Sequence, residues 1–156
     1  MEDLLRHTMA TLAYRGGKAL RGAPAEFADY QPSPGGRTPV QILAHMGDLF
    51  DWAIGLADGK HAWNNASPLP WDQEVARFFS RLETFDQRLS TGEPLGTSAE
   101  KLFQGPIADA LTHVGQLTML RRMAGCKIRG ENYFEAAIST GSVGAQQAGP
   151  VAEFDK

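Results

Sequence analysis

The sequence predicts an all-α protein, folded as a four-helix bundle with a long crossover loop. Four segments carry apolar side chains three and four residues apart, the spacing of a helix with one buried face. At about 20 residues each, these helices would be about 30 Å long. Glycine and proline cluster between the segments, and strand-like alternation is weak throughout. With 156 residues, 42% of them hydrophobic, the chain can form a single domain around one core.

The first helix is expected over residues 2–20. Its apolar residues recur at helical spacing from the N-terminal end onward. Gly22 and Pro24 follow directly and terminate the pattern, because glycine favours a helix end and proline cannot continue one. A loop over 22–37 is therefore expected to connect the first helix to the second.

The second helix has the clearest start signal in the chain. Thr38 can act as its N-cap, Pro39 suits the first helical position, and Gln41 stands where a capping box requires Glu or Gln. The apolar pattern then continues as far as Asp58 and Gly59, where glycine provides a stop. These signals predict a helix of about five turns.

A long loop over 59–70 leads to the third helix. Fully extended, a loop of this length reaches roughly 40 Å, enough to cross the bundle lengthwise, so a simple up-down-up-down order is not required. The third helix is expected over 71–91, and Gly92 and Pro94 end it. Its apolar stripe consists of Val75, Phe78, Phe79, Leu82, Phe85 and Leu89.

The fourth helix has two possible starting points. Thr97 with Glu100 resembles a capping box and places the start there. Gly105 and Pro106 interrupt the pattern, so the helix either kinks at this pair or has its main part begin there, with Pro106 in its first turn. Gly125 terminates the helix in both cases.

The remaining residues form an extension beyond the bundle core, which we assign to 2–125. The extension, 126–156, is expected to hold one short helix around 131–138, followed by an extended tail rich in Gly, Gln and Ala. We interpret 1–156 as a single helical-bundle domain.

Charge and hydropathy exclude several classes of function. With 15 Lys and Arg against 18 Asp and Glu, the net charge is −3, so the chain has no basic surface suited to nucleic acid or anionic lipid. No segment approaches the roughly 18 apolar residues needed to span a bilayer. The first residues also lack the basic start and apolar run of a signal peptide. A cytoplasmic protein with no nucleic-acid or membrane partner is expected.

The chain has one cysteine and four histidines as possible soft metal ligands. The single Cys126 excludes an internal disulfide and an all-cysteine metal site, and a small packed thiol is the expected state of this residue. We interpret His7, on a mixed helix face, as a surface residue. His61 falls in the long loop, where it either lines the mouth of a pocket or is simply solvated. His45 and His113 differ from both because they fall on apolar helix faces.

Three polar residues on these faces form a candidate metal site. His45 shares its face with Ile42, Leu49, Trp52 and Leu56, so it should point into the bundle. Asp109 and His113 are four residues apart, which places them on one face at roughly 6 Å. Buried imidazole and carboxylate groups are costly unless they are paired or bind a metal. Two imidazoles and one carboxylate with open positions suit zinc, nickel or Fe(II).

Simpler interpretations of the same residues stay open. An inward histidine can be a hydrogen-bonded core residue, Asp109 can favour the helix dipole, and Asp109 can pair with His113 without a metal. Asp48 and Gln116 are alternative third ligands. A ferritin-like di-iron site is excluded, because the Glu-x-x-His pairs that it requires are absent from the sequence.

At these residues the chain resembles the DinB/YfiT-like family of metalloenzymes. The resemblance spans most of the chain, and the block on the fourth helix is its most specific part. It rests on Thr38-Pro39, Leu43-Ala44-His45-Met46, Asp109-Ala-Leu-Thr-His113-Val-Gly-Gln116, Leu120-Arg121-Arg122-Met-Ala-Gly125 and Arg129-Gly-Glu-Asn-Tyr-Phe134.

The resemblance implies a four-helix bundle with a long crossover, often a homodimer, that holds a divalent metal by three histidines. His45 and His113 match two of these ligands, whereas Asp109 stands where the family has the third histidine. A carboxylate here lowers the charge of a divalent centre from +2 to about +1, so a bound water should be less acidic than under three neutral ligands.

The resulting functional hypothesis is a metal-dependent enzyme acting on a small molecule, with a low-molecular-weight thiol as a co-substrate. S-transfer or related Lewis-acid chemistry is the class that the resemblance implies. Gln116 is expected to hydrogen-bond the nucleophile or a ligand, and Trp52, Asn132 and Tyr133 to line the substrate pocket. The alternatives are a non-catalytic metal-binding or stress-related protein, and a metal-free helical interaction protein.

Overall fold

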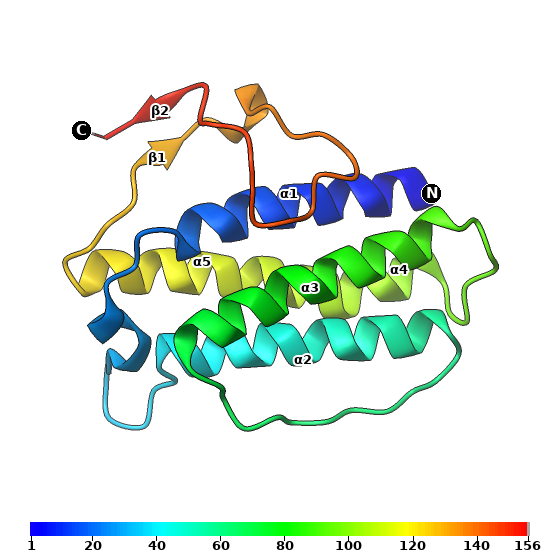
Figure 1. Ribbon diagram of the computed structural model, residues 1–156, viewed down its shortest axis with the longest axis horizontal. Coiled ribbons are helices and arrows are strands. Elements are labelled where there is room, and N and C mark those ends of the chain that lie inside the picture. Colours follow the sequence, from blue (N-terminus) through cyan, green and yellow to red (C-terminus); the bar gives the residue numbers. More distant parts are fainter. Residues whose placement is uncertain (156) are drawn as a thin grey trace.

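The chain forms a bundle of four helical rods, which confirms the predicted all-α fold (Figure 1). A computed structural model describes residues 1–155. The first three rods are α1 (Glu2–Leu20), α2 (Pro39–Ala57) and α3 (Trp71–Ser90). The fourth is continuous through α4 (Ala99–Leu102), the π-helical turn η2 (Phe103–Ile107) and α5 (Ala108–Met123). Between α1 and α2 the chain forms a short 3-10 helix, η1 (Ala25–Asp29).

The crossover loop determines the order in which the helices run. Residues 58–70 lie along the length of the bundle, beside α2, and return the chain to the end where α2 began (Figure 1). As a result α2 and α3 run in the same direction, whereas α1 and the α4–α5 rod run in the opposite one. The long loop therefore crosses the bundle, which the reach of its sequence allows.

The start of α2 matches the predicted N-cap, whereas the start of α4 differs from its prediction by one residue. The backbone N–H of Thr38 donates to the side chain of Gln41 at 2.9 Å, as the capping box requires. The fourth rod begins one residue later than expected, because the Ser98 hydroxyl, rather than Thr97, accepts the N–H of Lys101 at 3.3 Å. Either hydroxyl is chemically suited to the N-cap, so sequence alone does not separate the two.

The helix continues through Gly105 and Pro106 instead of starting anew. These residues lie within the π-helical turn η2, which connects α4 to α5. Proline lacks the N–H that an α-helix would use there, and a π-helical turn accommodates the missing bond without ending the rod. Of the two expected possibilities, the structure therefore shows a locally distorted continuous helix.

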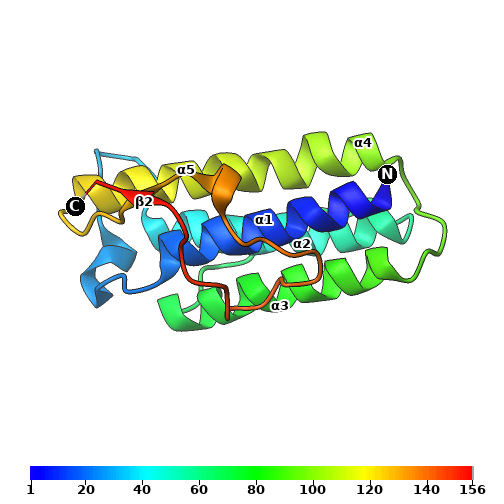
Figure 2. The same cartoon turned by 90° about the horizontal axis from the view of Figure 1, so that it is seen from above.

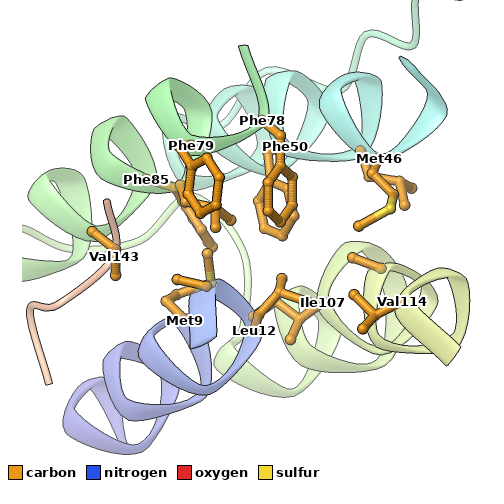
Figure 3. Packing of buried hydrophobic residues seen from close by; sticks show 14 of the residues in the cluster. Met9, Leu12, Met46, Phe50, Phe78, Phe79, Phe85, Ile107, Val114 and Val143 are labelled. Atoms are coloured by element: carbon orange, nitrogen blue, oxygen red, sulfur yellow. The ribbon is translucent and has the colours of Figure 1, made fainter. Parts of the chain in front are cut away.

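The core lies between all four rods. Aromatic side chains from α2 and α3 face aliphatic side chains from α1 and the fourth rod, among them Phe50, Phe78, Phe85, Met9, Leu12 and Ile107, all at most 1% exposed (Figure 3). Gly16 lets α1 approach α3 closely, because a Cβ there would lie 3.0 Å from the ring of Phe78. The rods that carry the candidate site are therefore fixed by a continuous apolar core.

The extension packs across the bundle but is not helical over 131–138. It forms the strands β1 (Gly130–Glu131) and β2 (Glu153–Phe154), which pair antiparallel, and only a 3-10 turn, η3 (Tyr133–Glu135), falls within the predicted helix. The expected short helix is thus reduced to three residues. The chain then crosses α1 towards α3 (Figure 2) and buries Val143 in the core. Tertiary contacts override helix propensity in this segment.

Candidate metal centre

The structure brings His45, Asp109 and His113 together where α2 and α5 pack side by side. The Nε2 atom of His45 lies 3.3 Å from one carboxylate oxygen of Asp109, and the Nε2 atom of His113 lies 3.4 Å from the other. The two imidazole rings meet edge to face, with centroids 4.9 Å apart. One ligand atom from each residue lies within 4.8 Å of the other two. The i, i+4 pair on α5 and the single histidine on α2 therefore converge.

This arrangement fits a divalent metal ion. With metal–ligand bonds of about 2.0–2.2 Å, neighbouring ligand atoms around one ion lie roughly 3.0–3.6 Å apart. The two separations from Asp109, one to each of its oxygens, fall within that range, and one ligand atom from each residue lies within 4.8 Å of the other two. Two imidazole nitrogens and one carboxylate are also ligands that zinc, nickel and Fe(II) accept. We conclude that the His45-Asp109-His113 group could hold a metal ion.

The hydrogen bond of His113 to Gln116 fixes its ring so that Nε2 faces Asp109. Its Nδ1–H donates to the side-chain oxygen of Gln116 at 2.7 Å. In a neutral imidazole the other nitrogen, Nε2, then carries a lone pair, and this lone pair faces the Asp109 carboxylate. Two electron-rich groups in contact favour a cation between them. Gln116 thus stands where a residue that orients a metal-ligating histidine is usually found.

His45 is also held in a form suited to metal binding. Burial lowers the pKa of its imidazole, and the nearby His113 and Arg37 act in the same direction, whereas the hydrogen bond with Asp109 opposes them. The net shift is downward, so His45 is neutral at pH 7 and retains a lone pair. Neutral imidazole is the form that binds metals.

The site opens to solvent on the side of Asp109. The Asp109 side chain is 46% exposed, compared with 19% for His45 and 9% for His113. A cavity of about 480 Å³ adjoins His113 and Gln116, and a second of about 420 Å³ is lined by Asp109 and Trp52. Both volumes lie within the range of small-molecule sites. A ligand can therefore approach the three residues from two directions.

The crossover loop adds an aromatic wall that the sequence did not identify. The ring of Trp63 meets His45 edge to face at 5.5 Å, and it meets Trp52 in the same way at 5.7 Å. His61 stacks on Trp52, with centroids 5.7 Å apart, so it lies beside the site without joining the three clustered ligands. The sequence signal that could have indicated this wall is the pair His61 and Trp63, in a loop long enough to cross the bundle beside the site.

Asp48, the alternative third ligand, serves to fix this loop. Its carboxylate accepts the N–H of Ala66 at 3.2 Å and the guanidinium of Arg77 at 2.6 Å. Buried Glu74 accepts the N–H of Leu69 at 2.9 Å, so both ends of the segment 66–69 are tied to helices. Asp48 therefore positions the aromatic wall and does not belong to the cluster of three ligands.

Asn132 and Tyr133 lie away from the three ligands. The Tyr133 ring packs against Tyr14 at 6.2 Å and under the guanidinium of Arg15 at 4.4 Å. The cavity that it lines contains no member of the cluster. Asn132 uses its side chain to accept the N–H of Phe134 at 3.2 Å, at the start of η3. Of the residues expected to line the pocket, the structure places only Trp52 beside the site.

The remaining histidine and the cysteine take part in other contacts. His7 is exposed and contacts the Thr140 hydroxyl at 3.4 Å. Cys126 is partly buried and packs against the core.

No helix among residues 1–155 is both long enough and apolar enough to cross a bilayer. Comparison of the chain with protein-family models, with curated proteins and with solved structures found no match. Functional inference therefore rests on the geometry of this site.

Proposed function

We propose that the protein is a small metal-dependent enzyme, of the DinB/YfiT-like type that its sequence resembles, with His45, Asp109 and His113 as metal ligands. The observation that carries this proposal is the convergence of the three side chains: the Nε2 atoms of His45 and His113 lie 3.3 Å and 3.4 Å from the Asp109 carboxylate, while Gln116 engages Nδ1 of His113.

His45, Asp109 and His113 would hold the divalent ion, which would supply Lewis-acid activation of a thiol or a water near neutral pH when bound. Zinc, nickel and Fe(II) are the candidate ions. The residues of the chain hold and orient the reactants: Gln116 fixes the His113 ring, and Trp52 and Trp63 shield one side from water. We propose a low-molecular-weight thiol as the co-substrate and a small electrophilic molecule as the substrate of an S-transfer. The thiol loses its S–H proton to solvent, and its sulfur forms a bond to the electrophilic carbon as the leaving group departs from that carbon with its electron pair.

Metal removal tests the enzymatic proposal. We expect protein purified without a histidine tag to contain close to one divalent metal ion per chain by elemental analysis. Consumption of a thiol in the presence of an electrophile should stop after treatment with a chelator and return when the metal is restored. Unchanged activity in protein shown to be free of metal would contradict the proposal.

A non-catalytic metal-binding protein is the second candidate, and Asp109 is the observation that favours it. A carboxylate in the third position reduces the positive charge available for activating a bound molecule. The His45→Ala variant separates the two functions. A lower melting temperature for the variant, together with no measurable turnover in the parent, would indicate a structural role for the metal.

We also propose that two copies of the chain associate through a groove between α1 and the start of the fourth rod, α4 and η2. The groove is lined by exposed apolar side chains, with Met1 75%, Leu4 64% and Phe103 46% exposed. Contiguous apolar surface of this kind commonly marks an interaction site. Light scattering should give twice the 16.9 kDa mass of one chain. Leu4→Glu should give the monomer mass, and Leu69→Glu, in the crossover loop, should not; a monomeric wild type would contradict the proposal.

A further inference from the structure

We propose that Arg37 binds the carboxylate of a small-molecule reactant, whose apolar part lies in the cavity beside His113. This inference rests on the proposed function, because it identifies the chemical class of the molecule that reaches the metal site. It assigns a role in specificity to a residue in a loop, outside the three ligands. Its evidence is the composition of the cavity and the free guanidinium of Arg37.

The cavity connects Arg37 to the candidate metal site. It encloses about 480 Å³, with His113 and Gln116 on one side and Arg37 on another. The walls between them are apolar and consist mainly of Ile42, Met119 and Leu120. Apart from His113, Arg37 is the only ionisable residue among the described residues that line the cavity. A molecule with one anionic end and an apolar body matches this lining.

The guanidinium of Arg37 is available for a ligand. Arg37 is exposed, and within residues 1–155 its guanidinium makes no hydrogen bond or ion pair. Arg15 and Arg122 also lack such bonds, but they line a different cavity, whereas Arg37 lines the one beside His113. The loop before Arg37 is held in place, since the Gln31 amide donates to the carbonyls of Ser33 at 2.7 Å and Gly36 at 2.8 Å. Arg37 thus combines a fixed backbone with an unpaired side chain.

The chemistry favours a carboxylate over a phosphate. One guanidinium neutralises one negative charge and can bind a carboxylate through two parallel hydrogen bonds. A phosphate group with close to two charges would call for further donors, and the described lining offers only the Gln116 amide beside the histidine. Thr38, next to Arg37, precedes His45 by seven residues, or about 10 Å along the helix. The carboxylate should therefore lie several bonds from the reacting atom.

Calorimetric titration with two matched thiols tests this inference. The probes are 6-mercaptohexanoic acid and its methyl ester, which carry an apolar chain between the thiol and the carboxyl group and differ in one negative charge. We expect zinc-loaded wild type to bind the acid at least about tenfold more tightly than the ester, because only the acid pairs with Arg37. In Arg37→Gln the acid should bind as weakly as the ester, with affinity for the ester unchanged. Arg37→Lys should keep part of the preference.

Arg122→Gln is the matched control, since Arg122 is an exposed arginine on α5 that lines a different cavity. Zinc content is measured for every variant. Equal affinity for acid and ester in wild type, a preserved preference in Arg37→Gln, or no binding of the acid at millimolar concentration would overturn the inference. Competition by inorganic phosphate stronger than by acetate would overturn the choice of carboxylate.

The same titration on metal-free protein separates this inference from the proposed function. A preference for the acid that depends on Arg37 and survives without zinc supports the anion site by itself. Failure of the protein to bind any divalent metal would refute the proposed function, even if that preference remains. Loss of the preference in protein that binds zinc normally would refute only the role of Arg37.

Discussion

Replacing His45 or His113 with alanine is expected to abolish stoichiometric zinc binding. Changing only the partner that orients a metal-ligating histidine typically costs 10–100-fold in affinity, so loss of one of three ligands should cost more than about 100-fold. Gln116→Ala should fall in the smaller range, because it removes the hydrogen bond to His113 Nδ1 but no ligand. Competition titration against a chromogenic chelator measures all three variants.

His7→Ala is the control, because His7 is an exposed histidine that contacts only a threonine hydroxyl. Its zinc affinity should equal that of wild type. Asp109→Ala tests the third ligand, and Asp109→His tests whether a neutral donor can replace it. Affinity unchanged in Asp109→Ala would show that the carboxylate is a neighbour rather than a ligand, and affinity unchanged in His113→Ala would exclude the site as a whole.

The bundle could be predicted because helices are specified by local patterns. Apolar spacing, the capping box at Thr38 and the glycine stops each depend on residues within a few positions of one another. The helix predicted over 131–138 was wrong because long-range contacts, rather than local patterns, determine the structure there. Glu131 is drawn into a strand by contacts with α1, more than a hundred residues earlier in the chain, and no local pattern contains that information.

The ligands of the candidate site were predictable for the same reason, and the residues around them were not. Asp109 and His113 share a face because a helix places them there, and His45 stands on the apolar side of its own helix. Trp63 and Arg37 lie beside the site but belong to loops. Loops have no repeating apolar spacing, so the sequence does not predict where their side chains lie. The contacts of Arg121 could not be predicted either. In addition to favouring the dipole of α5, its buried guanidinium donates to the carbonyls of Ala19 and Arg21 at 3.0 Å.

The contact that displaced the predicted helix should also make a large contribution to stability. Glu131 is fully buried and accepts hydrogen bonds from the Lys18 ammonium and the Tyr14 hydroxyl, each at 2.6 Å. Lys18 also binds Glu153 at 2.8 Å, so one cation on α1 holds both strands of the extension. Lys18→Met leaves a buried carboxylate without its counter-charge. We expect a loss of about 3–5 kcal/mol in the free energy of unfolding.

The pH dependence of this loss identifies its cause. Burial alone would raise the pKa of Glu131, but the hydrogen bonds from Lys18 and Tyr14 outweigh burial and lower it. Because the folded-state pKa lies below the unfolded one, the ion pair stabilises the wild type above the ordinary carboxyl pKa, and this contribution fades as the pH falls through the folded value. Without Lys18, burial raises the pKa of Glu131, so acid should neutralise the orphaned charge and reduce the deficit.

Urea denaturation at pH 7 and pH 4 measures this effect. The difference between wild type and Lys18→Met should be large at pH 7 and smaller at pH 4, whereas Lys127→Met, which changes an exposed lysine, should match wild type at both. Adding Glu131→Gln to Lys18→Met should recover part of the loss, since it removes the unpaired charge while keeping the shape of the side chain. A deficit of equal size at pH 7 and pH 4 would show that packing of the lysine stem, rather than its charge, holds the extension in place.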